Sequence, residues 1–214
     1  MTHATSPAST IRRPRIGVFG GTFDPVHKGH LHIANGMRDQ LELERIVWVP
    51  AGRPPHKLGQ IVSSDEDRLA MLELALRDLP QDTISRIEVD RPGPSYTADT
   101  LQQLAAELAP AELVFLMGED SLRDFPNWRD PDRILAHASL GVAQRPGIDA
   151  NLQVLTQALP ALCGRVHLAN IPELPVSSSE IRARVARGES ITHLTPEPVA
   201  QYIRDHGLYL PAAG

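Results

Sequence analysis

The sequence predicts an α/β fold in which an open parallel sheet carries helices on both faces and ends in a short helical C-terminal extension. Short apolar runs that end in glycine or proline alternate with segments whose apolar residues recur every three or four positions. This alternation is typical of βαβ units with right-handed crossovers. The length of 214 residues and the 42% hydrophobic content suit one domain with a sizeable core. The predicted architecture is therefore Rossmann-like.

The strands are predicted where apolar residues run together between turn signals. The first strand, Ile16 to Gly20, ends in paired glycines, and the fourth is followed by Gly118. The expected strands span residues 16–20, 45–49, 84–89, 113–117, 140–143 and 166–168.

The helices are predicted by the three-to-four spacing and by capping signals. After the first strand, Leu31, Ala34 and Met37 fall on one helix face. Ser63 followed by Glu66 indicates a capping box at the start of the second helix. Residues 118–130 are expected to form a polar turn. Further helices are expected at 97–108, 131–137, 151–159, from 177 onward, and at 196–206.

The domain organisation expected is a disordered leader at 1–14, rich in Ser, Thr, Ala and Pro, and one domain at 15–214, whose residues 176–210 form the helical C-terminal part. The single cysteine, Cys163, cannot form an internal disulfide, which favours a reducing, cytoplasmic compartment. Its side chain is expected to be buried as a small apolar group. No apolar run is long enough to span a bilayer.

The charge balance argues against a general polyanion partner. Lys and Arg number 21 against 26 Asp and Glu, a net charge of −5. Nucleic-acid and anionic-membrane binding usually require a basic excess, so neither partner is expected. Any phosphate site must be built locally.

One stretch, Gly20-Gly21-Thr22-Phe23-Asp24-Pro25-Val26-His27-Lys28-Gly29-His30, carries the chemistry. A strand that leads through a glycine turn into a helix N-terminus places free backbone N–H groups and the positive end of the helix dipole at an anion. The stretch is neither a Walker A loop nor a dinucleotide fingerprint. Two other roles for the histidines are a metal pair, for which no further ligand is evident nearby, and packing at the helix start.

The expected topology joins this stretch to a second one. In an open parallel sheet, ligands bind beyond the carboxyl ends of the strands where the strand order reverses. If the first and fourth strands flank that point, Gly20-Gly21-Thr22 and Gly118-Glu119-Asp120 face one crevice from two sides.

The stretch resembles the signature of the nucleotidyltransferases that carry an H-x-G-H motif. Five further stretches resemble bacterial nicotinate-nucleotide adenylyltransferases in particular: Arg53 to Lys57, Pro94 to Leu101, Gly118 to Asp120, Phe125 to Trp128 and Val176 to Arg182. The resemblance covers residues 15 to 210, and it implies transfer of AMP from ATP to nicotinate mononucleotide, giving deamido-NAD and pyrophosphate. It also implies Mg²⁺, carried by the phosphates and not by protein side chains. The attacking group is the mononucleotide phosphate, so no covalent enzyme intermediate is needed.

The resemblance assigns catalysis to His27, His30 and Arg182. The ATP site that it implies consists of Gly20, Gly21, Thr22, Phe23, His27, His30, Gly118, Asp120, Ser177, Ser178 and Arg182. Ser179 stands where the family motif has threonine, and Val176 where it has isoleucine.

The second substrate is expected to bind at Lys57, His56, Tyr96, Thr97 and Trp128. Alternatives stay open for each: the 53–57 loop could be a solvated basic turn, Thr97 a helix cap, and Trp128 a loop-packing residue. At the level of function, the alternatives are a nicotinamide-mononucleotide or other H-x-G-H transferase, and a nucleotide-binding regulator without turnover.

Overall fold

The computed structural model describes residues 13–52, 63–144 and 151–211. Six parallel strands form one sheet in the order β3-β2-β1-β4-β5-β6. This confirms the predicted open parallel sheet. The strands are β1 Arg15–Gly21, β2 Arg45–Pro50, β3 Thr83–Ile84, β4 Glu112–Gly118, β5 Ala138–Gln144 and β6 Val166–Asn170.

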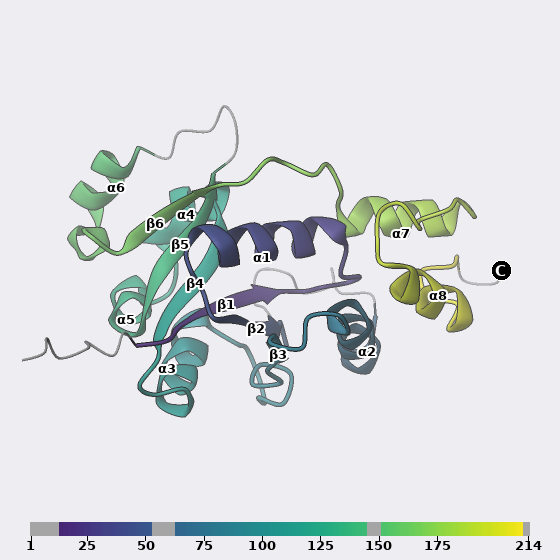
Figure 1. Ribbon diagram of the computed structural model, residues 1–214, viewed down its shortest axis with the longest axis horizontal. Coiled ribbons are helices and arrows are strands. Elements are labelled where there is room, and N and C mark those ends of the chain that lie inside the picture. Colours follow the sequence, from purple (N-terminus) through teal and green to yellow (C-terminus); the bar gives the residue numbers. More distant parts are fainter. Residues whose placement is uncertain (1–12, 53–62, 145–150, 212–214) are drawn as a thin grey trace, which may run out of the picture.

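Helices cover both faces of the sheet, with α1 on one side of β1 and α3 on the other (Figure 1). The last two helices, α7 and α8, lie beyond the carboxyl end of β1 in the same view. The helices are α1 Lys28–Gln40, α2 Asp65–Leu76, α3 Thr97–Glu107, α4 Glu119–Asp124, α5 Pro131–His137, α6 Leu152–Ala158, α7 Ser178–Ala186 and α8 Glu197–Asp205, with 3₁₀ turns η2 Phe125–Asn127 and η3 Pro160–Leu162.

The strand order reverses between β1 and β4. From β1 the chain moves outward to β2 and β3, then returns to the other side of β1 and continues through β4, β5 and β6. Gly17 pairs with Val114, and β1 and β4 run parallel, so their carboxyl ends meet at one edge. The predicted adjacency of the first and fourth strands is confirmed, and it makes this edge the expected place for a ligand.

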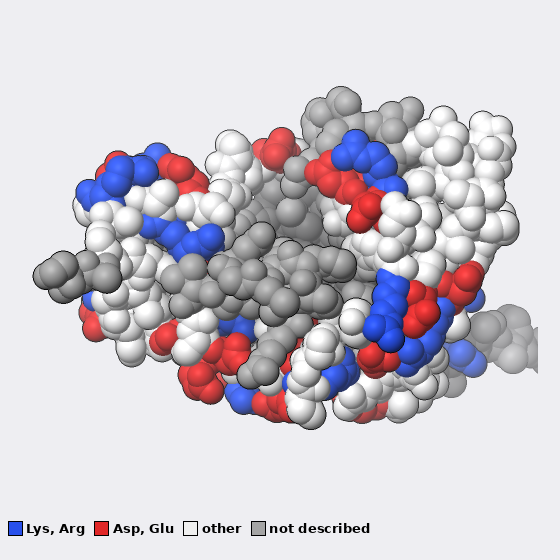
Figure 2. Space-filling view, turned by 180° about the vertical axis from the view of Figure 1, so that it is seen from behind, with Lys and Arg blue, Asp and Glu red and all other residues white. Residues whose placement is uncertain are grey.

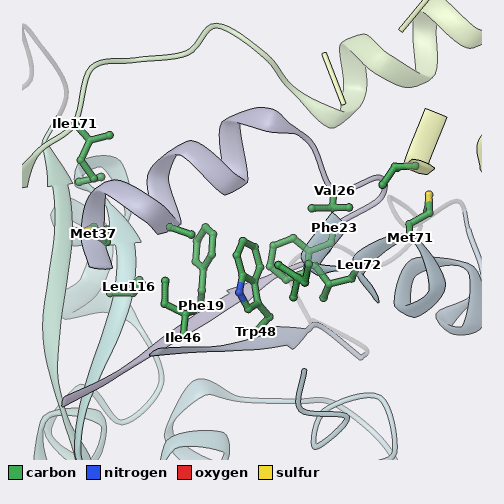
Figure 3. Close-up of a cluster of buried hydrophobic side chains, with 14 of the residues drawn as sticks. Phe19, Phe23, Val26, Met37, Ile46, Trp48, Met71, Leu72, Leu116 and Ile171 are labelled. Carbon is green, nitrogen blue, oxygen red and sulfur yellow. The ribbon is translucent and has the colours of Figure 1, made fainter. Parts of the chain in front are cut away.

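Two apolar cores, one on each face, fix the sheet against its helices. Between α1 and the sheet, Phe19, Phe23 and Trp48 lie side by side (Figure 3). Their ring centroids are 5.0 to 5.8 Å apart, in edge-to-face or tilted pairs that suit aromatic quadrupoles. The Trp48 indole N–H donates to Asp82 Oδ2 at 3.0 Å, which satisfies the polar atom of a fully buried ring. This core therefore holds the end of β1 in place.

Several boundaries differ from those predicted. The third strand keeps only two residues, because the chain after Ile84 folds into a turn in which Asp90 N donates to the Arg86 carbonyl at 2.9 Å. The second helix is capped by Ser64, not Ser63: Ser64 Oγ accepts from Asp67 N at 3.0 Å. The polar turn expected after Gly118 contains α4 and η2.

Cys163 was expected to be buried and is exposed. The 3₁₀ turn η3 ends immediately before it, and the Cys163 amide bonds back to the Pro160 carbonyl at 3.1 Å, so the residue lies in a surface turn. Cys163 is therefore not part of either apolar core.

The described surface mixes charges of both signs. On the face shown in Figure 2, Lys and Arg side chains alternate with Asp and Glu over the coloured regions. None of the helices in the described part of the chain is both long and apolar enough to cross a membrane.

Candidate active site

The loop between β1 and α1 is held by bonds to its backbone carbonyls. Arg68 of α2 is fully buried and donates from Nη1 to the Thr22 carbonyl at 2.8 Å. Arg182 of α7 donates to the Asp24 carbonyl at 2.7 Å, and Ser178 Oγ to the Pro25 carbonyl at 2.9 Å. Because these carbonyls are occupied, the loop has a fixed shape before any ligand binds.

The two histidines of the motif cap the helix for each other. His27 Nδ1 accepts from the His30 amide, and His30 Nδ1 accepts from the His27 amide, both at 3.3 Å. Their rings stack with centroids 3.7 Å apart. Since each Nδ1 is an acceptor, each neutral ring carries its proton on Nε2. The pair therefore presents two Nε2–H donors, a suitable arrangement for phosphate oxygens.

Burial keeps His27 neutral. The side chain is 7% exposed, and burial lowers the pKa of its imidazole to about 4. In this neutral form the imidazole has one N–H donor to offer a phosphate oxygen.

A first cavity of about 240 Å³ lies beside the glycine turn. Gly20 and Gly21 contribute to its lining, as do the predicted second-substrate residues Tyr96, Thr97 and Trp128. The structure thus brings these three together next to the end of β1. Trp128 lies edge-on to Phe115, with ring centroids 6.0 Å apart, and both side chains line the cavity.

Thr97 is not a helix cap. The N-cap of α3 is Tyr96, whose side chain makes no capping hydrogen bond, and Thr97 is the first helical residue. The capping interpretation of Thr97 was therefore wrong, and its place in the cavity lining favours the ligand role.

A second cavity of about 270 Å³ lies on the histidine side of the same motif. His27, Gly29 and His30 contribute to its lining, as do Ser177 and Ser178 from the start of α7. Ser177 Oγ caps α7 by accepting from Glu180 N at 3.2 Å. Two helix N-termini, those of α1 and α7, therefore open onto one cavity, which suits a polyphosphate.

Arg182, which was predicted to bind the outer phosphates, bonds to the loop and to its own helix. Its Nη1 bonds to the Asp24 carbonyl, and its Nη2 bonds to Ser179 Oγ at 3.3 Å. A guanidinium has five N–H donors, so these two bonds leave others for phosphate oxygens.

Gly118 caps the short helix α4, and a Cβ built on it would have no atom within 4 Å. That open space is what a nucleotide needs to approach the backbone closely. Asp120 of α4 lies 3.4 Å from Arg123 in an exposed ion pair.

One other predicted position has a different role in the structure, and two lie in a part of the chain that the structure does not describe. Phe23 is fully buried among aromatic rings, so only its backbone can meet ATP. His56 and Lys57 lie outside the described residues.

Two charged residues of the first cavity were missed by the sequence reasoning. Glu88 was assigned to a strand, but it lies in the turn after β3 and lines the cavity. Arg129 directly follows Trp128, which was the one available signal. Its guanidinium carbon lies 4.1 Å from the centre of the Tyr96 ring.

Within the described ranges, no group of three or more His, Cys, Asp or Glu side chains is arranged to hold a metal ion. At the second cavity, the helix N-termini of α1 and α7 instead offer groups that suit phosphate oxygens.

Comparison with known proteins agrees with this geometry. Residues 18–184 match the cytidylyltransferase-like family. A probable nicotinate-nucleotide adenylyltransferase from Thermomicrobium roseum is 50% identical over 195 residues, which cover 91% of each chain. The corresponding protein of Roseiflexus sp. is 46% identical over 91% of this chain and 97% of its own.

A solved structure shares the fold at low identity. Plasmodium falciparum nicotinic acid mononucleotide adenylyltransferase, complexed with NaAD, superposes with a TM-score of 0.74 at 18% identity, over 92% of this chain and 98% of that one. At this identity the likeness supports the Rossmann-like fold alone. The family match and the relatives at 46 to 50% identity show the family: this chain belongs to the nicotinate-nucleotide adenylyltransferases, within the cytidylyltransferase-like family.

Proposed function

We propose that this chain transfers AMP from ATP to nicotinate mononucleotide, giving deamido-NAD and pyrophosphate. The observation that carries the proposal is the histidine-capped helix start between two cavities, at the point where the strand order reverses. Each cavity fits one substrate: the aromatic one suits the pyridine nucleotide, and the one formed by two helix N-termini suits the triphosphate.

The reaction needs alignment and charge neutralisation, not a protein nucleophile. A phosphate oxygen of the mononucleotide attacks the α-phosphorus of ATP in line, while the bond from that phosphorus to the β-phosphate oxygen breaks and pyrophosphate leaves. His27 and His30 donate Nε2–H bonds to oxygens that gain charge in the transition state, and the backbone at Gly21 and Thr22 adds further N–H donors. Arg182, Ser177 and Ser178 hold the leaving phosphates.

Mg²⁺ is part of the proposal and would enter with ATP. The metal would neutralise charge on the β- and γ-phosphates when bound. On the protein side, the helix start at Ser177 and Ser178 and the guanidinium of Arg182 would hold the phosphates that carry it. A cytoplasmic location is also proposed, supported by a sequence with a single cysteine.

Pyrophosphate release tests the function directly. Purified protein with ATP, Mg²⁺ and nicotinate mononucleotide should release pyrophosphate, and the rate should be much lower with nicotinamide mononucleotide. Equal rates would contradict the preference for the acid, and release with neither substrate would contradict the enzyme and support a regulator that binds nucleotides without turnover.

A further inference from the structure

The first cavity carries two opposite charges among its described residues. Of the side chains known to line it, Arg129 is the one cation and Glu88 the one carboxylate, and the other lining residues are neutral. The two charges come from different elements: Arg129 follows η2, and Glu88 lies in the turn after β3. A ligand with both an anionic and a hydroxyl-bearing part can therefore enter in only one favourable orientation.

We propose that Arg129 binds the ring carboxylate of nicotinate mononucleotide and thereby selects the acid over the amide, while Glu88 accepts hydrogen bonds from the ribose hydroxyls. The inference rests on the proposed function and assigns the roles of two residues in it.

The surroundings of Arg129 prepare it for a carboxylate. Its guanidinium lies over the Tyr96 ring at 4.1 Å, a cation–π contact that uses the flat face of the group and leaves the N–H donors at its edge. Asp130, the nearest acidic group in the described structure, is 3.9 Å from Arg129 Nε, and both side chains are more than half exposed. Such a pair is weak, so a ligand carboxylate can compete for the guanidinium. Trp128 lines the cavity immediately before Arg129 and provides a surface for the pyridine ring.

The surroundings of Glu88 suit a hydroxyl-bearing sugar. Thr100 Oγ1 donates to Glu88 Oε1 at 2.8 Å, and Arg91 Nη1 in turn donates to Thr100 Oγ1 at 3.0 Å. This chain of bonds fixes the carboxyl group. Burial raises the pKa of Glu88, which means that the charged form gains from further donors. Two adjacent ribose hydroxyls supply them.

The cavity lining combines residues from separate elements, as a mononucleotide combines separate chemical groups. The phosphate of a mononucleotide and its ring lie on opposite sides of the ribose. Likewise, Gly20 and Gly21, which would face the reacting phosphate, end β1, whereas Arg129 follows η2. In the proposal the ribose lies between them and meets Glu88, which lines the same cavity.

The test compares the two mononucleotides in charge variants. Arg129→Gln should lower kcat/KM for nicotinate mononucleotide about 10- to 100-fold, the loss expected for one hydrogen bond to a charged group. The value for nicotinamide mononucleotide should change by less than about threefold, so the ratio between the substrates falls. Arg129→Lys should lie between, because lysine keeps the charge but loses the fork-shaped donor set.

Arg86→Gln is the matched control. It removes the same charge from an exposed arginine, paired with Asp90, that is not among the residues lining the cavity. Its substrate ratio should stay at the wild-type value.

Glu88→Gln tests the role proposed for Glu88 in binding the ribose. Both mononucleotides carry the same ribose, so this variant should raise KM about equally for both and leave their ratio unchanged. An unaltered ratio in Arg129→Gln, or equal losses for the two substrates, would overturn the role of Arg129. A Glu88→Gln variant that alters the ratio, or leaves KM unchanged, would overturn the role of Glu88. Wild-type turnover tests the proposed function separately, because it does not depend on either variant.

Discussion

The mutual capping of His27 and His30 explains at the level of single atoms why the two histidines stand three residues apart. In an α-helix the N-cap side chain reaches the amide three residues on, and the third residue can reach back. Ser or Thr with Glu usually fills these positions. With imidazoles in both, the cap uses each Nδ1, and the proton of each neutral ring lies on Nε2. Capping the helix and binding phosphate are therefore compatible roles for the same two side chains.

The low pKa of His27 makes folding depend on pH. Its pKa is about 4 in the folded chain against an ordinary 6.5, so the unfolded chain binds more protons between these values. The stability contributed by this group is complete above pH 6.5 and is lost as pH falls toward 4. In His27→Asn, which keeps a capping side chain, the free energy of unfolding should fall less between pH 7 and pH 5 than in the wild type, by about 2 kcal/mol. Urea denaturation at the two pH values measures this.

An equal fall in both proteins would show that the buried imidazole does not control this pH range. The same result would also weaken the inference that His27 meets its phosphate as a neutral donor.

His30 should act mainly in the transition state. Removing one such donor commonly costs about 10²- to 10³-fold in kcat, so we expect a loss of that size in His30→Ala, together with the loss of about 0.5 to 2 kcal/mol of stability that follows from removing a capping side chain. His32→Ala is the matched control, since His32 lies on the same helix and bonds to the Pro172 carbonyl at 2.8 Å. Its kcat should remain near the wild-type value. A loss of kcat of less than tenfold in His30→Ala, or an equal loss in the control, would show that His30 caps and packs the helix start without acting in the transition state.

At the level of elements, two glycines differ in the space around them: one is required by packing within the protein, and the other leaves room for a ligand. A Cβ on Gly52, just after β2, would lie 2.1 Å from the Glu88 carbonyl oxygen. A Cβ on Gly118, at the end of β4, would meet nothing within 4 Å. The first glycine lets a loop pack against the turn after β3, whereas the second leaves space at the crevice.

Alanine at these two positions should therefore act differently. Gly52→Ala should lower the free energy of unfolding by about 1 to 3 kcal/mol and raise KM for the mononucleotide, because Ala51 and Glu88 both line its cavity. Gly118→Ala should change stability by less than about 0.5 kcal/mol but raise KM for ATP. Chemical denaturation and steady-state kinetics distinguish the two. Similar destabilisation by both variants would show that the space at Gly118 is filled by the protein itself.

The elements that the sequence predicted well are those whose signals are local. Hydrophobic runs and spacing gave the sheet strands and most helices, and Pro131 to His137 was bounded correctly. The third strand was predicted too long, since only the tertiary approach of Gly52 to Glu88 reveals that the chain turns away after Ile84. The helix α4 was missed because six residues are too few for a periodic pattern.

The same distinction applies to the site. His27 and His30 lie within one motif and could be assigned from it. Glu88 lines the cavity because the chain turns after β3, and the sequence of this turn has no recognisable motif. The guanidinium of Arg129 lies over the ring of Tyr96, a residue more than thirty positions earlier in the chain. The sequence around Arg129 does not indicate this contact.

In the molecule as a whole, the C-terminal extension holds the loop between β1 and α1. Thr195 Oγ1 donates to the Val26 carbonyl at 2.9 Å, and the Lys28 amide donates to the Leu194 carbonyl at 2.9 Å. Tyr209, near the end of the described chain, donates its hydroxyl to Asp24 Oδ1 at 2.7 Å. Asp24 is 1% exposed, so this carboxylate depends on donors from distant segments. Residues nearly the whole chain apart thus fix one loop.

Tyr209→Phe should reveal this coupling in the kinetics. Loss of the hydroxyl removes a donor from a buried carboxylate, which should lower stability by about 1 to 3 kcal/mol and loosen the loop that positions the histidines. Because small displacements at a reacting centre are costly, kcat should fall about tenfold or more, while KM for the mononucleotide stays near the wild-type value. Tyr202→Phe is the matched control, since it removes a hydroxyl bonded to Asp67 at 2.9 Å between α8 and α2. If both variants lose the same stability but only Tyr209→Phe loses kcat, the extension acts on catalysis through the loop. If the two kcat values are alike, the extension stabilises the fold and has no separate effect on the reaction.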